Sequence, residues 1–251
     1  HRQSSAASDV YKRQKQMLFI RSLLFYIFFI SSIILVSLVI NILYLFASTK
    51  ILQNICKYWI ALNNKVLSFL CNINYEVSGY EHLPSEPCIV IANHQGPWES
   101  LFVQTLKIPS CSIIKKDLTL IPFFGWGLAA LKPIRINRKT KLSSLKKVVS
   151  KSVNRLKNGS TVIIFPEGTR NSADYGPSKF SASFARVGMI SGAPIIPVCH
   201  NSGKFWINKT FTKNPGTIKV KIGKPFFINN EKLDVSEIEQ WFRKNYNALH
   251  I

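Results

Sequence analysis

An imidazole and a carboxylate stand close together in this sequence, directly after an apolar run. His94 and Glu99 are separated by four residues and follow residues 88–92, Cys-Ile-Val-Ile-Ala. A neutral imidazole accepts a proton from an alcohol near pH 7, and a neighbouring carboxylate stabilises the imidazolium that forms. The two side chains can meet only across a turn, which Gly96 and Pro97 supply. The pattern predicts a base with its orienting acid; a structural histidine is the open alternative.

A second motif with chemical potential lies in a Pro/Gly turn after another apolar run. Residues 161–164, Thr-Val-Ile-Ile, precede Phe165-Pro-Glu-Gly-Thr-Arg170. Gly168 permits close backbone approach, Arg170 offers a planar fork of donors suited to phosphate, and Glu167 can accept from a hydroxyl. Binding groups in open α/β sheets lie at the carboxyl ends of strands. The two motifs together predict proton abstraction from a hydroxyl beside a bound anion; an ordinary surface Glu–Arg pair is the alternative.

Strand-like and helical patterns alternate through the part of the chain that carries both motifs. Alternation begins at about Tyr75, and residues 142–156 repeat apolar side chains at three- and four-residue intervals. A last helix is signalled by Asp234 with Glu237 three residues later. Such alternation predicts an α/β fold with a largely parallel central sheet flanked by helices. The predicted strands are residues 88–92, 111–114, 133–136, 161–165, 195–199 and 217–222.

The chain is strongly basic and carries a long uncharged stretch near its beginning. Its 251 residues include 33 Lys and Arg against 12 Asp and Glu, a net charge of +21. Nucleic acid and an acidic membrane surface are the two anionic partners that this charge favours. Residues 22–49 are uncharged and would span ~40 Å as a helix, more than the ~30 Å hydrocarbon core of a bilayer. They predict a retained membrane-embedded helix; a buried core helix is the alternative.

The remaining N-terminal patterns suggest how the chain is divided. Residues before Met17 are polar without a hydrophobic period and read as adapter sequence or a disordered leader, so Met17 is the expected start. Residues 51–71 have amphipathic helical spacing, and Tyr58 and Trp59 suit a membrane interface. The predicted parts are a leader at residues 1–16, membrane-anchoring helices at 17–73 and a catalytic domain at 74–251.

The two motifs, about seventy residues apart, resemble those of the glycerophospholipid acyltransferases. Within that family they are most similar to the bacterial 1-acyl-sn-glycerol-3-phosphate acyltransferases. Residues 132–138 resemble the second block of the family in part, and residues 193–198 resemble its fourth. The resemblance covers roughly residues 75–225, and the apolar N-terminus agrees with it. One departure is Glu99, where the family more often has Asp.

The resemblance implies an O-acyltransferase that uses an acyl thioester of coenzyme A or acyl carrier protein. The acceptor would be the sn-2 hydroxyl of 1-acyl-sn-glycerol-3-phosphate (lysophosphatidic acid), and the product phosphatidic acid. His94 would remove the hydroxyl proton while Glu99 holds the imidazole. A thioester is already activated, so the reaction requires no metal, cofactor or covalent enzyme intermediate. The implied ligands of the phosphate and glycerol are Lys115, Arg138, Glu167, Gly168, Thr169 and Arg170.

Location and partners follow from the same reasoning. Acyl thioesters are cytosolic, so we expect the bacterial inner membrane, a catalytic domain on its cytoplasmic face, and anionic lipids as additional partners. Within the class, glycerol-3-phosphate or another lyso-lipid is the alternative acceptor. From another class, the alternative is a non-enzymatic basic protein that binds membranes or nucleic acid. No nucleic-acid fold motif is visible in the sequence, so nucleic acid is not an expected partner.

Overall fold

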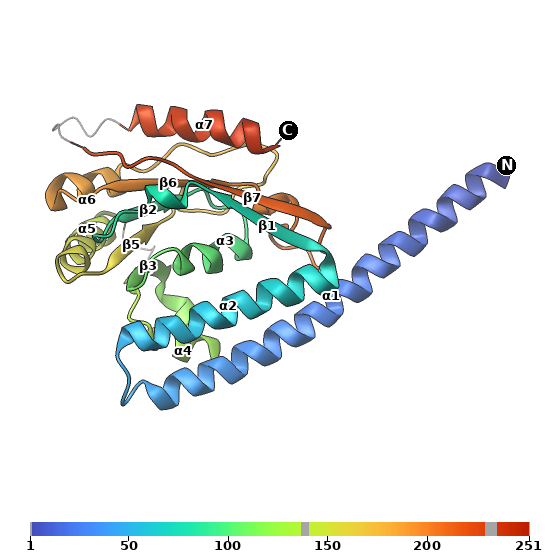
Figure 1. The fold of residues 1–251 in the computed structure, drawn as a ribbon, viewed down its shortest axis with the longest axis horizontal. Coiled ribbons are helices and arrows are strands. Elements are labelled where there is room, and N and C mark those ends of the chain that lie inside the picture. The colour runs from blue at the N-terminus through green and yellow to red at the C-terminus, as the bar shows by residue number, and fades with distance from the viewer. Residues whose placement is uncertain (1, 137–140, 229–234, 251) are drawn as a thin grey trace.

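Seven strands form one sheet in the computed structural model, which describes residues 2–136, 141–228 and 235–250 (Figure 1). The strand order is β1-β7-β6-β2-β5-β3-β4. Neighbouring strands in these ranges pair in parallel, except β6 and β7, which are antiparallel. This architecture confirms the predicted α/β fold. The strands are β1 (Ile73–Ser78), β2 (Ile89–Ala92), β3 (Ser110–Lys115), β4 (Ile134–Ile136), β5 (Thr161–Ile164), β6 (Ile195–His200) and β7 (Gly216–Ile222).

All six predicted strands are present, each within one residue of its predicted bounds. The seventh, β1, was not predicted. It lies at the edge of the sheet, and after the buried Ile73 the side chains of residues 74–76 are exposed. An edge strand with a solvated surface lacks the apolar run by which buried parallel strands are recognised.

Helices cover both faces of the sheet (Figure 1). On β2, Ile89 and Ile91 pack with α5, α6 and α7, whereas Val90 and Ala92 pack on the side of α1, α2 and α3. Because successive side chains of a strand point to opposite faces, burial on both faces explains the continuous apolar run at residues 88–92. The helices are α1 (Arg2–Leu43), α2 (Thr49–Cys71), α3 (Pro97–Phe102), α4 (Phe124–Ala130), α5 (Lys141–Lys157), α6 (Ser183–Ser191) and α7 (Ser236–His250). Short 3₁₀ turns are η1 (Tyr80–His82), η2 (Val103–Thr105), η3 (Lys116–Leu120) and η4 (Ser202–Lys204).

The two N-terminal helices form a hairpin against one side of the sheet (Figure 1). Among the described helices, α1 is long and apolar enough over Asp9–Leu43 to cross a membrane, and only 17% of its most apolar window is buried. That exposure disfavours the alternative of a buried core helix. The first part of α1 projects away from the molecule and includes the polar residues of the predicted leader.

Helix α2 is held against the sheet by hydrogen bonds. The Gln53 amide donates to the carbonyl of Ser110 at 2.6 Å and accepts from its N–H at 2.9 Å. Trp59, expected at a membrane interface, instead lies inside the hairpin, where its indole N–H donates to Ser32 of α1 at 3.0 Å. Tyr58 is 75% exposed on the outer surface. The polar residues of α1 and α2 therefore account for a close hairpin, which amphipathic spacing alone does not specify.

Candidate active site

The ends of three adjacent strands meet at one edge of the sheet. Strands β6, β2 and β5 are neighbours and run parallel, so their carboxyl ends lie side by side. His94 follows β2, Glu167 follows β5 and Ser202 follows β6. The two sequence motifs are thus brought together across about seventy residues, as the strand-end rule predicts.

His94 and Glu99 are in direct contact. The His94 Nδ1 atom lies 2.9 Å from Glu99 Oε1. The chain turns at Gly96, and Pro97 is the first residue of α3, as predicted. Because an ionised carboxylate only accepts hydrogen bonds, Nδ1 carries the ring proton and Nε2 is left with its lone pair. The geometry is that of a histidine held in the tautomer that a general base requires.

Glu99 is fully buried yet well supplied with donors. Its Oε1 atom also accepts from the backbone N–H groups of Gln95 (2.8 Å) and Gly96 (2.6 Å) at the start of α3. Burial alone would raise the pKa of the Glu99 carboxyl, but the hydrogen bond from His94, the nearby imidazoles of His200 and His94 and the Gly96 N–H together lower it to about 2. Glu99 is therefore ionised at any pH where the protein is expected to act.

The loop after β5 fixes His94 from the other side. Phe165 stacks on the imidazole with ring centroids 4.2 Å apart. The Glu167 Oε1 atom accepts from the backbone N–H of His94 at 2.7 Å, while Oε2 accepts from Asn171 and from the N–H and hydroxyl of Ser178. Glu167 was expected to meet the glycerol of a substrate. Its carboxylate joins the loop after β2 to the loop after β5, and the contact with glycerol stays a prediction.

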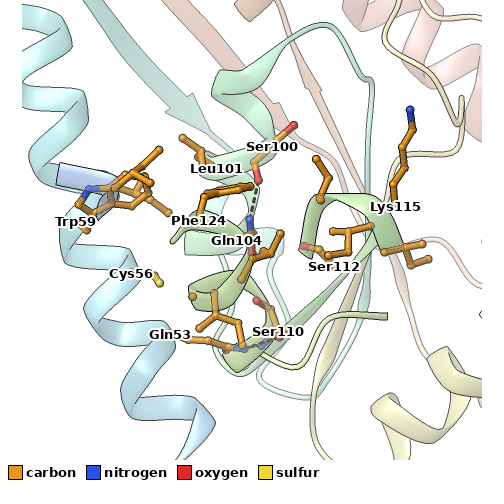
Figure 2. Close-up of a pocket in the computed structure, with 18 of the residues that line it drawn as sticks. Gln53, Cys56, Trp59, Ser100, Leu101, Gln104, Ser110, Ser112, Lys115 and Phe124 are labelled. Carbon is orange, nitrogen blue, oxygen red and sulfur yellow. Dashed lines mark hydrogen bonds between the residues drawn. The ribbon is translucent and has the colours of Figure 1, made fainter. Parts of the chain in front are cut away.

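A cavity of about 690 Å³ has His94 in its wall and extends between the sheet and the helical hairpin. Figure 2 shows side chains of α2, α3, β3 and α4 around it, with the Gln104 amide donating to the Ser100 carbonyl at 2.8 Å. The volume is typical of a site for a medium-sized organic ligand. Residues labelled in the wall are Gln53, Cys56, Trp59, Ser100, Leu101, Gln104, Ser110, Ser112, Lys115 and Phe124.

Several predicted anion-binding residues line the same cavity as His94. They include Lys115 at the end of β3, Thr169 and Arg170. Arg170 is exposed and donates to the side chain of Asn208 at 3.3 Å. Gly168 does not line the cavity; its φ of +70° makes the turn that carries Arg170 into place. Arg138 lies outside the described residues.

Sequence reasoning missed the contribution of the strand β6 and the loop after it. Ser202 donates to Glu99 Oε2 at 2.8 Å, and Asn208 and Lys209 line the cavity. The signal that pointed to them was the predicted strand at residues 195–199, since groups after any parallel strand reach this edge of the sheet. What the sequence lacked was the strand order, which places β6 next to β2.

The chain is similar to several known proteins. The model of the acyltransferase family matches residues 74–201. A 1-acyl-sn-glycerol-3-phosphate acyltransferase from Pseudomonas aeruginosa is 38% identical, over 72% of this chain and 68% of that protein. The Saccharomyces cerevisiae protein of the same name is 26% identical, over 71% of this chain and 59% of its own length. The crystal structure of a 1-acyl-sn-glycerophosphate acyltransferase from Thermotoga maritima matches with a TM-score of 0.79 at 23% identity, covering 94% of this chain and 97% of that one, so the fold is shared.

Proposed function

The chain belongs to the acyltransferase family, and we propose that it makes phosphatidic acid by acylating the sn-2 hydroxyl of 1-acyl-sn-glycerol-3-phosphate. The acyl donor is a thioester of coenzyme A or acyl carrier protein. The observation that carries this proposal is a base, His94, in the wall of one cavity with the cations Lys115 and Arg170. The acceptor is inferred from the names of the relatives, and the chemistry is inferred from the residues.

In the proposed mechanism, His94 acts as general base through Nε2. It takes the proton of the sn-2 hydroxyl as that oxygen attacks the thioester carbonyl carbon. The carbon–sulfur bond then breaks, and the imidazolium returns the proton to the departing thiolate, so the enzyme ends as it began. Glu99 holds Nδ1–H and stabilises the imidazolium. Base catalysis of this kind supplies about 10²–10⁴-fold, and positioning of the two substrates supplies much of the rest.

Recognition of the acceptor phosphate is assigned to Arg170 and Lys115. Both are exposed at the cavity, where a guanidinium fork and an ammonium complement a dianionic phosphate monoester. Thr169 lines the same cavity and offers a hydroxyl. Glu167 is given the role of holding the His94 loop, because its carboxylate oxygens already accept from His94, Asn171 and Ser178.

The apolar part of the cavity is assigned to an acyl chain. Its wall toward the hairpin includes Ile33, Val36 and Ile40 of α1 and Ile60 of α2. An apolar surface on membrane helices offers a chain dissolved in the bilayer a path that does not cross water. The hairpin therefore serves the reaction as well as anchoring the protein.

The proposed location is the bacterial inner membrane, with the sheet on the cytoplasmic face. Support comes from the exposed apolar surface of α1 and from a net charge of +21, which attracts anionic lipid headgroups. Hydrophobic insertion is insensitive to salt, whereas headgroup attraction is screened by it. Membranes washed at high salt should therefore retain the full chain, and detergent should release it. Release by salt alone would contradict the anchoring role.

The acceptor is tested with purified full-length protein and a panel of lipids. The panel contains 1-acyl-sn-glycerol-3-phosphate, glycerol-3-phosphate and a lyso-lipid without a phosphate monoester, each with acyl-CoA and with acyl carrier protein thioester. We expect transfer to be fastest with the first acceptor and absent in His94→Ala. His82→Ala is the matched control, because His82 lies in η1 and bonds the Ile222 carbonyl away from the site. Transfer that prefers another acceptor would correct the substrate, and full activity of His94→Ala would refute the mechanism.

A further inference from the structure

A hydroxyl from a third strand end reaches the buried carboxylate. Ser202, fully buried in η4 after β6, donates to Glu99 Oε2 at 2.8 Å. The other carboxylate oxygen, Oε1, receives His94 Nδ1 and two backbone N–H groups. Among the described residues, Ser202 is thus the hydrogen-bond donor to Oε2. We infer that Ser202 is a positioning residue of the acyl-transfer reaction, acting on His94 through Glu99; the inference rests on the proposed function.

The protons around Ser202 have a definite arrangement. His200 Nε2 lies 2.7 Å from the backbone carbonyl of Asn93, which can only accept, so Nε2 carries the His200 proton. Burial lowers the pKa of His200, so the ring is neutral and its Nδ1 atom is an acceptor. Nδ1 lies 3.3 Å from the Ser202 N–H and 3.1 Å from its hydroxyl oxygen. Because the backbone N–H supplies Nδ1, the single hydroxyl proton is available for the carboxylate.

The position of His200 is itself fixed by the sheet. The Asn93 side chain donates to the His200 carbonyl and accepts from its N–H, both at 3.0 Å. This reciprocal pair joins the end of β6 to the loop after β2, and these two strands immediately precede Ser202 and His94. The hydroxyl therefore reaches Glu99 from a rigid support, which limits rotation of the carboxylate and keeps Oε1 directed at His94 Nδ1.

Loss of the hydroxyl should alter how the His94–Glu99 pair takes up protons. A donor to a carboxylate favours its charged form, so removing Ser202 concentrates negative charge on the atoms facing His94. The coupled pair then binds its proton at higher pH, and the acid limb of the kcat profile moves upward. Charged or titratable groups near the pair in the described residues include His200 of β6, Glu167 and Arg170 of the loop after β5, and Tyr246 of α7, which bonds Gln95. Lys57 of α2, Lys115 of β3 and Lys209 after η4 line the same cavity as His94.

The test compares Ser202→Ala with Ser202→Thr in the full-length protein. For the alanine variant we expect kcat to fall about tenfold, the size of one lost charge-assisted hydrogen bond, with KM nearly unchanged and the acid limb shifted upward. The threonine variant keeps a hydroxyl and should restore both the rate and the limb. Ser152→Ala is the matched control: Ser152 is also fully buried, but its hydroxyl has no hydrogen-bond partner in the described part of the chain.

The outcomes separate this inference from the proposed function. Wild-type kinetics in a folded Ser202→Ala variant would overturn the inference, as would a loss at all pH values with an unmoved acid limb. If the alanine variant does not fold, Ser202→Cys, which keeps the volume but donates weakly, is judged by the same criteria. In a His94→Ala background, Ser202→Ala should cause no further loss. Full activity of His94→Ala alone would refute the proposed mechanism, whatever Ser202 does.

Discussion

The surroundings of Glu99 contrast with those of Lys213, although 0% and 1% of these two charged side chains are exposed. Glu99 receives hydrogen bonds from His94, from Ser202 and from two backbone N–H groups. The Lys213 ammonium has no hydrogen-bond partner among the described residues. It lies instead over aromatic rings, 3.4 Å from the ring centre of Tyr26 and 4.8 Å from that of Trp206.

The two environments have opposite effects on the charged forms of these side chains. Donors keep Glu99 ionised, whereas burial lowers the pKa of Lys213 to about 8 and so favours its neutral form. The contrast separates a charge that contacts the proposed base from one that packs between two parts of the fold. The backbone N–H of Lys213 donates to the side-chain oxygen of Ser22 in α1 at 2.9 Å, so this residue links α1 to the loop after η4.

The largest expected effect comes from replacing His94, the side chain that Glu99 contacts. His94→Ala removes the proposed base while leaving a buried carboxylate with its other donors, so the fold should persist. We expect kcat to fall at least ~10²-fold. Single-turnover measurements on protein whose thermal unfolding matches that of the wild type will check this. Near-normal turnover would exclude His94 as the base.

A second change tests the carboxylate itself. Glu99→Ala leaves His94 Nδ1–H without its acceptor and should lower kcat by about 10²-fold, because the imidazole loses its fixed tautomer. Glu99→Asp keeps the charge and should retain substantial activity. Steady-state kcat of the two variants decides between them. Equal activity of the alanine and aspartate variants would show that the charge at this position is not needed.

The exposed cations Arg170 and Lys115 should affect the preference for phosphate-bearing acceptors, whereas the buried Lys213 should not. Replacing Arg170 or Lys115 by Gln should weaken the use of phosphate-bearing acceptors by about 1.5–3 kcal/mol if one charged hydrogen bond is lost. An acceptor without phosphate should be affected less. Ratios of kcat/KM on the two acceptors measure this, and Lys213→Met should leave the ratio unchanged. Equal losses on both acceptors would assign Arg170 and Lys115 structural roles.

The smallest expected effect concerns the stability contributed at Lys213. Replacing an unpaired buried charge by an apolar side chain is often stabilising, so Lys213→Met should raise Tm by about 2–4 °C near pH 7. Folding lowers the pKa of Lys213, so burying its charge reduces the free energy of unfolding. This destabilisation is complete below about pH 8 and disappears as the pH rises from there to the ordinary pKa of 10.5. The difference in Tm should shrink over that range. The exposed Lys224→Met is the control, and a Tm difference independent of pH would contradict the explanation.

Local patterns in the sequence determined the elements and the motifs at their ends. Continuous apolar runs indicated the inner strands because both faces of the sheet are covered, as Ile89 and Val90 show on β2. The turn at Gly96 and Pro97 was specified by backbone stereochemistry, so the contact between His94 and Glu99 could be predicted. Each of these features depends on residues that are near neighbours in the chain.

Strand order and helix packing were decided only by the tertiary structure. Ser202 lies more than a hundred residues from Glu99 in sequence and reaches it because β6 is the neighbour of β2. Trp59 and Glu167 stood out in the sequence for other roles, because their partners, Ser32 and the His94 N–H, come from other elements. Such pairings depend on which surfaces bury the most apolar area and satisfy the most polar atoms together, a property of the whole chain that no single segment contains.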